Sequence, residues 1–172
     1  MRRLQVSVMI GLLAVCASVA LVWAQGRGSA AGALSALDYA EIRQLHMRYA
    51  QGTDFGNAEM WLGVFTQDAS FNPTANAGSK PQVGKEALRA WRMNNFANRK
   101  PPYHYRHWPG TFTITPTPDG NAKGLVYWMA FNPTTKPLSI ADTGFYDDVY
   151  VRTPEGWRIK SRDAHSDPQP DK

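Results

Sequence analysis

The stretch SIADTGFYDDVYVRT-PEG-WRIKSRDA, residues 139–164, decides the fold class. Residues 139–153 alternate between apolar and polar side chains over a long span, which is typical of a β-strand with one buried face. The sequence Pro154-Glu155-Gly156 then predicts a tight turn, and residues 157–164 predict a second strand. This stretch is therefore expected to be an antiparallel hairpin that closes a sheet.

Further strands are predicted upstream of this hairpin. Residues 105–115 and 122–131 are rich in aromatic and branched side chains, and the turn sequence Asp119-Gly120-Asn121 separates them. A short strand is predicted at residues 69–72, closed by Pro73. The second half of the chain is therefore expected to be an antiparallel sheet.

Three helices are predicted in the first half of the chain. Ser35 is expected to cap the first helix, Asn57 the second, and Gly84 to open the third, while Gly52 ends the first. Helices followed by an antiparallel sheet predict the α+β class. We expect a cone-shaped α+β barrel in which a curved sheet wraps around the three helices, with Gly144 as the bending point of the long strand.

Each helix is predicted to turn one apolar face to the core. In the first helix, Ile42, Leu45 and Tyr49 recur at helical spacing, whereas His46 is expected off this stripe and at the surface. The buried faces of the second and third helices are predicted to comprise Met60, Trp61, Val64 and Phe65, and Leu88, Trp91 and Asn95.

The N-terminus has the pattern of a secretory signal peptide. Arg2 and Arg3 precede an apolar stretch, and Val22-Trp23-Ala24 predicts cleavage after Ala24. We therefore divide the chain into a signal peptide at 1–24, a linker at 25–34, a domain at 35–166 and a tail at 167–172. The expected location is secreted or periplasmic, without stable membrane association after cleavage. The alternative is a membrane anchor formed by an uncleaved signal.

Composition excludes several classes of function. The formal charge is +5, but the Lys and Arg residues are scattered, so no nucleic-acid partner is expected. The only cysteine, Cys16, lies in the predicted signal peptide, so the mature chain is expected to lack disulfides. There is no metal-ligand spacing, no Gly-rich phosphate loop and no nucleophile elbow, and we expect neither a metal nor a cofactor.

Several motifs resemble one known family. They are the run at residues 45–50 with Asp54 and Gly56, the sequence Phe65-Thr66-Gln67-Asp68-Ala69, residues 84–88, Arg106-His107, residues 144–148 and residues 156–159. In this order they resemble the SnoaL-like families of the nuclear-transport-factor-2-like superfamily, over about residues 35–165. Within it, the chain resembles the scytalone and bile-acid dehydratase branch. In the bile-acid dehydratase a tyrosine lies five residues before a catalytic aspartate, as Tyr49 lies before Asp54, and a histidine on the first long strand completes the group, as His107 would here.

The resemblance implies a catalytic group of Asp54, His107 and Tyr49. A carboxylate that is hydrogen-bonded to one imidazole nitrogen raises the basicity of the other nitrogen. The ring can then act as a general base near neutral pH. Tyr49 would donate a hydrogen bond to a developing enolate. The alternative is that Asp54 caps a turn and His107 is a structural residue of the sheet. Trp61, Tyr127 and Tyr146 are expected to contact the substrate.

The first functional hypothesis is an exported, cofactor-independent lyase of the dehydratase type. It would act on a small or polycyclic apolar carbonyl or hydroxyl compound, and an isomerase or cyclase would use the same pocket. The alternative is a non-catalytic domain that binds a hydrophobic ligand or another protein. A homodimer is expected through the open face of the sheet, where Trp128, Val149 and Val151 are predicted to be exposed.

Overall fold

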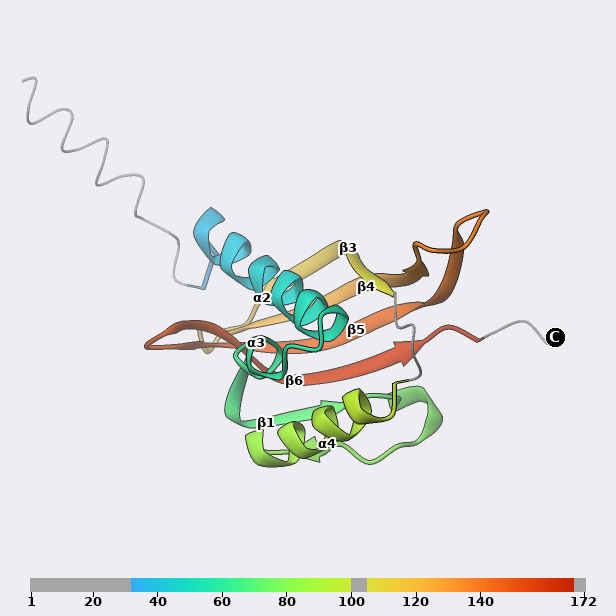
Figure 1. Ribbon diagram of the computed structural model, residues 1–172. Coiled ribbons are helices and arrows are strands. Elements are labelled where there is room, and N and C mark those ends of the chain that lie inside the picture. The colour runs from blue at the N-terminus through green and yellow to red at the C-terminus, as the bar shows by residue number, and fades with distance from the viewer. Residues whose placement is uncertain (1–31, 100–104, 169–172) are drawn as a thin grey trace, which may run out of the picture. The chain divides into compact units, whose positions relative to one another are not determined.

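The computed structural model describes residues 32–99 and 105–168, and Leu34–Lys172 form one compact unit. Figure 1 shows its helices and its sheet. The elements are α2 (Ala36–Asp54), α3 (Ala58–Leu62), β1 (Phe65–Asn72), the 3-10 helix η1 (Ala75–Ala77), β2 (Gln82–Val83), α4 (Lys85–Ala97), β3 (Arg106–Pro116), β4 (Ala122–Asn132), β5 (Ser139–Thr153) and β6 (Gly156–Ser166). The predicted signal peptide, most of the predicted linker and residues 169–172 lie outside the described residues.

The start of α2 is tied to the sheet by one carboxylate. The Ser35 hydroxyl accepts the Asp38 backbone N–H, and Asp38 in turn accepts the Ser35 N–H at 2.8 Å, which completes a capping box. Asp38 Oδ1 also accepts from Trp157 Nε1 at 3.0 Å and from Arg152 Nη2 at 2.6 Å. Burial opposes ionisation of Asp38, but these hydrogen bonds outweigh it and lower its pKa well below the ordinary value.

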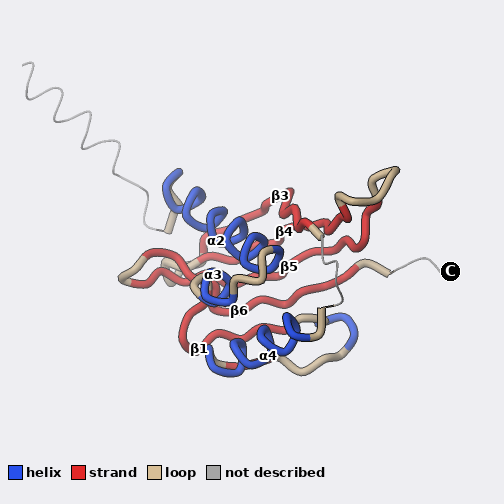
Figure 2. Tube along the Cα trace, viewed as in Figure 1, coloured by secondary structure: helices blue, strands red, loops and turns tan. Residues whose placement is uncertain are grey.

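The six strands form one curved sheet that does not close, in the order β2-β1-β6-β5-β4-β3. Neighbouring strands are antiparallel except β1 and β6, which run parallel. In the views of Figures 1 and 2, α2 crosses the strands β3 to β6 while α4 lies along β1. The predicted α+β class with a curved sheet and three helices is confirmed.

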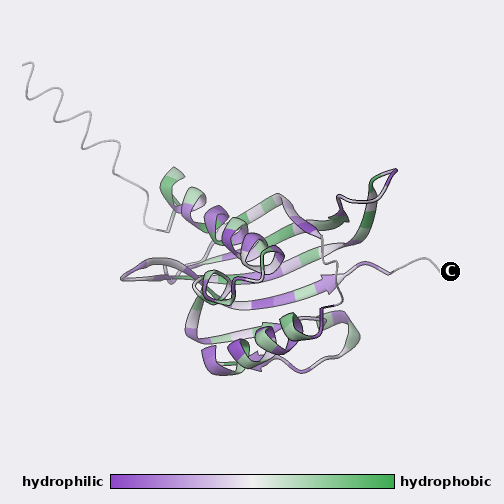
Figure 3. Ribbon diagram, in the orientation of Figure 1, coloured by the Kyte–Doolittle hydropathy of each residue, from purple (hydrophilic) through white to green (hydrophobic). Residues whose placement is uncertain are grey.

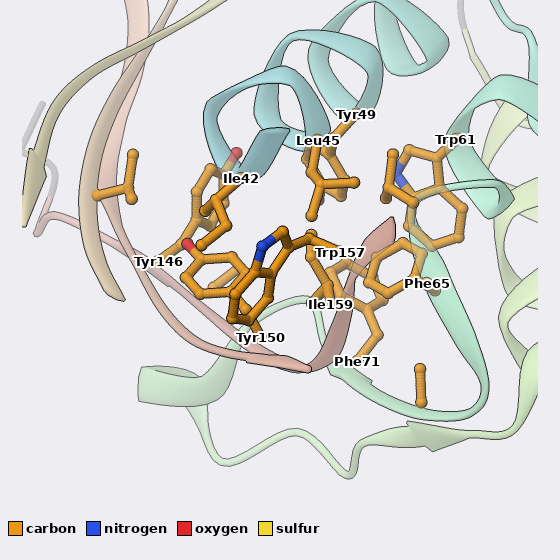
Figure 4. Packing of buried hydrophobic residues seen from close by; sticks show 14 of the residues in the cluster. Ile42, Leu45, Tyr49, Trp61, Phe65, Phe71, Tyr146, Tyr150, Trp157 and Ile159 are labelled. Atoms are coloured by element: carbon orange, nitrogen blue, oxygen red, sulfur yellow. The ribbon is translucent and has the colours of Figure 1, made fainter. Parts of the chain in front are cut away.

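Alternation along the strands separates the interior from the outer face. In β4 every second residue from Ala122 to Ala130 is buried, and the residues between them are exposed. Figure 3 shows this alternation as bands of different hydropathy along the sheet. The core lies between the sheet and α2 and α3, as Figure 4 shows for Ile42, Leu45, Trp61 and Trp157 among the labelled side chains.

Gly144 is the position where the sheet leaves no room for a side chain. A Cβ atom there would lie 1.9 Å from the carbonyl oxygen of His165 on β6. The close approach of β5 and β6 therefore requires glycine at the point where the sequence predicted a bend.

The second helix is shorter than the sequence predicted. α3 ends at Leu62, Gly63 follows as its C-cap, and Phe65 begins β1. Val64 and Phe65 are buried as expected, but they are not helical. The prediction was wrong because a buried apolar run has the same appearance at a helix end and at a strand start. In the part of the chain that the structure describes, no helix is long and apolar enough to cross a membrane.

Candidate active site

A cavity of about 330 Å³ opens between the helices and the inner face of the sheet. Its aromatic walls are Tyr49, Phe71, Trp91, Trp128 and Tyr146. Polar side chains also line it: Thr53, Arg92, Asn95, His107, Asp142 and Ser166. A concave site that combines aromatic walls with polar and charged side chains can hold and orient a small molecule.

The Asp54 carboxylate binds His107 with both of its oxygens. Oδ1 lies 2.5 Å from His107 Nδ1, and Oδ2 accepts the His107 backbone N–H at 3.0 Å. Asp54 is the last residue of α2, and its side chain is 5 % exposed, against 18 % for His107. Because a carboxylate accepts at Nδ1, the neutral ring carries its proton there and Nε2 is left as the basic nitrogen.

Two predicted residues, Tyr49 and Tyr146, lie side by side in the wall of the same cavity. Their ring centroids are 5.6 Å apart, and Tyr146 stacks on Trp128 at 5.6 Å. Trp128 in turn lies 6.3 Å from the His107 ring, between centroids. Burial, reinforced by Tyr49, raises the pKa of Tyr146 well above its ordinary value, so its hydroxyl keeps the proton and can donate it in a hydrogen bond.

The structure does not bring Trp61 and Tyr127 into the cavity wall. Trp61 is fully buried and packs behind the wall, 5.6 Å from the Tyr49 ring between centroids. Tyr127 is 54 % exposed and lies on the outer face, because it alternates with the buried Val126 and Trp128 along β4. The structure therefore does not place these two residues in the interior pocket, where they were expected.

A buried polar network, which the sequence analysis missed, lies beneath the two tyrosines. Arg162 donates to Asp148 through Nε at 2.8 Å and Nη2 at 2.7 Å, and its guanidinium lies 4.3 Å and 4.0 Å from the ring centroids of Tyr49 and Tyr146. Both charged side chains are fully buried. This ion pair therefore supports the cavity wall from behind.

His46 belongs to this network and not to the surface, where it was predicted. It is 1 % exposed and lies one helical turn after Ile42, on the buried side of α2. Burial, with the nearby Arg162 cation, lowers the pKa of His46 well below its ordinary value. In the neutral ring, Nδ1 accepts from Arg162 Nη2 at 3.1 Å and Nε2 faces the Tyr150 hydroxyl at 2.8 Å.

Arg92 is a second charged residue that the sequence analysis passed over. The predicted face of the third helix comprised Leu88, Trp91 and Asn95, but Arg92 on α4 is 3 % exposed and lines the cavity. The signal was its position one turn after the fully buried Leu88. It was missed because an arginine is seldom expected on a buried face.

A second hollow, of about 610 Å³, lies on the outer face of the sheet. Trp108, Tyr127 and Met129 line it and are 62 %, 54 % and 40 % exposed. Trp128, which was predicted to be exposed on this face, is 9 % exposed because its ring turns toward the interior cavity. The outer face is apolar, but its exposed apolar side chains are Trp108, Tyr127 and Met129 and not the predicted Trp128.

Among residues 32–99 and 105–168, no group of three His, Cys, Asp or Glu side chains is arranged to hold a metal ion.

Comparison with known proteins identifies the domain. Residues 35–163 match the profile described as the SnoaL-like domain. An uncharacterized protein of Mycobacterium tuberculosis is 30% identical over 129 residues, which cover 73% of this chain and 82% of that protein. The anthranilate 1,2-dioxygenase small subunit of Burkholderia cepacia is 28% identical over 132 residues, covering 71% of this chain and 82% of the subunit.

A solved structure from Nostoc punctiforme, described as a protein with a cystatin-like fold, has a TM-score of 0.68 and 24% identity to this chain. The similarity covers 78% of this chain and 95% of that one. At this identity it shows the fold alone.

Proposed function

The chain belongs to the SnoaL-like family, which includes polyketide cyclases and dehydratases, and we propose that it is a cofactor-independent lyase of the dehydratase type. The observation that carries the proposal is the hydrogen-bonded pair of Asp54 and His107 at an aromatic cavity. The substrate would be a small or polycyclic compound with a carbonyl and a β-hydroxyl group.

In the proposed reaction, His107 Nε2 removes a proton from the carbon next to the carbonyl, and the electron pair moves to the carbonyl oxygen as an enolate. Tyr49 or Tyr146, which both line the cavity, donates a hydrogen bond to that oxygen. The enolate then collapses and the C–O bond at the β-carbon breaks. Protonated His107 returns its proton to the departing oxygen, so that water leaves. Asp54 stabilises the imidazolium between the two steps.

An isomerase or a cyclase would share the first step of this reaction. An isomerase would return the proton to another carbon, and a cyclase would use the enolate carbon to attack a second carbonyl group. Proton abstraction is therefore the step to test first, because it does not depend on the reaction subclass.

The test is deuterium uptake from D₂O into a cyclic ketone such as 2-tetralone, followed by mass spectrometry. We expect wild-type protein to exchange the α-protons well above the buffer rate, and His107→Gln to lose the excess. Exchange no faster than the buffer rate in wild type would remove the support for proton abstraction at this site. So would an exchange rate in His107→Gln equal to that of wild type.

A non-catalytic role is the second candidate, and the similarity to a dioxygenase small subunit favours it. In that case the apolar outer face would bind another protein, and the interior cavity would serve only to hold a ligand. Absence of exchange together with co-purification of a larger protein partner would favour this role.

We also propose that the chain is exported and forms homodimers through the outer face of the sheet. The basic and apolar N-terminal pattern supports export, and the exposed Trp108, Tyr127 and Met129 support the interface. N-terminal sequencing of material from the periplasm or medium tests export. The expected first residue is Gln25, and a retained Met1 contradicts cleavage.

A further inference from the structure

Two side chains of the cavity lining bury a polar atom that has no hydrogen-bond partner among the residues the structure describes. They are Thr53, through its hydroxyl oxygen Oγ1, and Trp128, through its indole nitrogen Nε1. We propose that these two groups hydrogen-bond to oxygen atoms of the ligand, so that the cavity selects a neutral ring compound with a carbonyl or hydroxyl group. The inference rests on the proposed function only in placing such an oxygen beside the base, His107.

Burial makes the missing partners costly to the protein. Thr53 is 6 % exposed and Trp128 is 9 % exposed, and their two polar atoms are out of contact with bulk water. A buried indole N–H or hydroxyl group nearly always has a partner, because a buried polar group without one destabilises the fold. A ligand that supplies the missing partner removes this cost, whereas a ligand without a matching group keeps it, and a site of this kind therefore discriminates between the two.

The fold places both residues next to the pair of Asp54 and His107. Thr53 lies one turn after Tyr49 on α2, on the cavity side of the helix, and directly precedes Asp54. Trp128 is on the buried face of β4, and its ring lies 6.3 Å from the His107 ring, between centroids. A ligand oxygen that is bonded to Trp128 is therefore held near the imidazole.

The indole nitrogen determines which kind of group it binds. An indole N–H is only a donor, whereas the Thr53 hydroxyl can donate or accept. A carbonyl or hydroxyl oxygen can accept from either group, but an ammonium group, which has only N–H donors, cannot accept from Trp128. The ring of Trp128 also stacks on that of Tyr146, 5.6 Å away between centroids, and such flat aromatic walls favour a ring compound.

Two other tryptophans provide matched controls. Trp61 Nε1 is also buried and has no partner among the described residues, but Trp61 packs behind the cavity wall and does not line it. Trp157 Nε1 is already bonded, since it donates to Asp38 Oδ1 at 3.0 Å. A ligand oxygen in the cavity should therefore bond to neither of these two indoles.

The first experiment follows the indole N–H signals of ¹⁵N-labelled protein by NMR during titration with 2-indanone. The Trp128 signal, assigned by its absence from the spectrum of Trp128→Phe, is expected to move to lower field as its N–H bonds to the ketone. The signals of Trp61 and Trp157 should move much less. Indane, the same ring system without the oxygen, controls for the ring current of the ligand and should not produce the shift.

The second experiment measures the dissociation constants of 2-indanone and indane for wild type and variants. The two probes differ in hydration, so the informative quantity is the change between proteins in the ratio of the two constants. Trp128→Phe keeps an aromatic ring but removes the N–H, and should lower the relative affinity for the ketone about tenfold. Trp61→Phe, the control, should leave the ratio unchanged.

Thr53→Val tests the second group without removing a bond that the fold uses. It should lower the relative affinity for the ketone about threefold. Thermal stability should not fall, because valine has a similar shape and the hydroxyl it replaces has no partner among the described residues. If Trp128→Phe does not fold in a thermal melt, sequential assignment identifies the Trp128 signal and Thr53→Val alone tests the ratio.

His107→Gln separates this inference from the acid-base proposal. It should keep both the shift of the Trp128 signal and the wild-type ratio, because His107 is not the group that binds the oxygen. If wild type shows no excess deuterium uptake but its Trp128 signal still moves, the acid-base proposal is wrong and the oxygen site stands. Deuterium uptake without movement of the Trp128 signal overturns the oxygen site alone.

Three results would overturn the inference. One is a Trp128 signal that does not move with 2-indanone up to millimolar concentration, and another is an equal shift with indane. The third is a ratio equal to that of wild type in folded Trp128→Phe or, where that variant does not fold, in Thr53→Val.

Discussion

Replacing Asp54 by asparagine keeps the size of the side chain but changes what His107 faces. Both carboxylate oxygens now accept, one from Nδ1–H at 2.5 Å and one from the His107 backbone N–H at 3.0 Å. An amide has only one oxygen. If that oxygen still accepts the His107 backbone N–H, the amide NH₂ group faces Nδ1. The ring then carries its proton on Nε2, which is the nitrogen that must act as the base.

The expected loss in α-proton exchange is about 10² to 10⁴ for Asp54→Asn and similarly for His107→Gln. This corresponds to about 3 to 5 kcal/mol of barrier. Stability should change less than activity, because the amide keeps the bond to the His107 backbone N–H and replaces the carboxylate bond to the ring by a neutral one, at a cost of about 1–3 kcal/mol. The double variant should be little slower than the poorer single variant, because the two side chains act as one unit.

The assay is deuterium uptake into 2-tetralone, with thermal melts of the same four proteins. Asp163→Asn, at an exposed position of β6, is the matched control and should exchange at the wild-type rate. Exchange near the wild-type rate in His107→Gln would refute the reasoning. A double variant whose loss in exchange rate equals the product of the two single losses would also refute it, since residues that act independently give that result.

Three other predictions concern stability and assembly. Asp38→Asn should lower the unfolding free energy at neutral pH by about 1–3 kcal/mol. Because the folded-state pKa of Asp38 is depressed, its contribution is fully present above the ordinary pKa of 3.8, declines below that pH, and is lost as pH falls through the folded-state pKa. Denaturant titrations at pH 7 and pH 3 should therefore show a smaller difference for the variant than for wild type, and an equal difference contradicts the assignment. Gly144→Ala should cost about 3 kcal/mol, because its Cβ would meet the His165 carbonyl at 1.9 Å. Gly110→Ala, whose nearest atom is at 3.8 Å, is the control, and equal melting temperatures for both would show that β5 and β6 can separate without cost. Wild type should be a dimer by light scattering at micromolar concentration and Tyr127→Glu should shift it toward monomer, whereas a monomeric wild type rules out the proposed interface.

The sequence alone determined the fold class and most element bounds. The strand predicted at residues 139–153 matches β5, and the predicted cap at Ser35 is present with its partner Asp38. These features could be predicted from the sequence because strand alternation and helix capping depend on residues close together in the chain. The pairing of Asp54 with His107 came from the family resemblance and was not encoded in local spacing, since the two residues are 53 positions apart.

Only the tertiary structure decided which side chains meet at the cavity. Arg92 and His46 are polar residues on helix positions whose partners come from other elements: the rings of Trp61 and Trp91 for one, Arg162 and Tyr150 for the other. Local sequence assigns such residues to the surface because an unpaired buried charge is costly. Their burial becomes favourable once folding supplies the partners, and those partners are set by the curvature of the sheet and the packing of the helices on it.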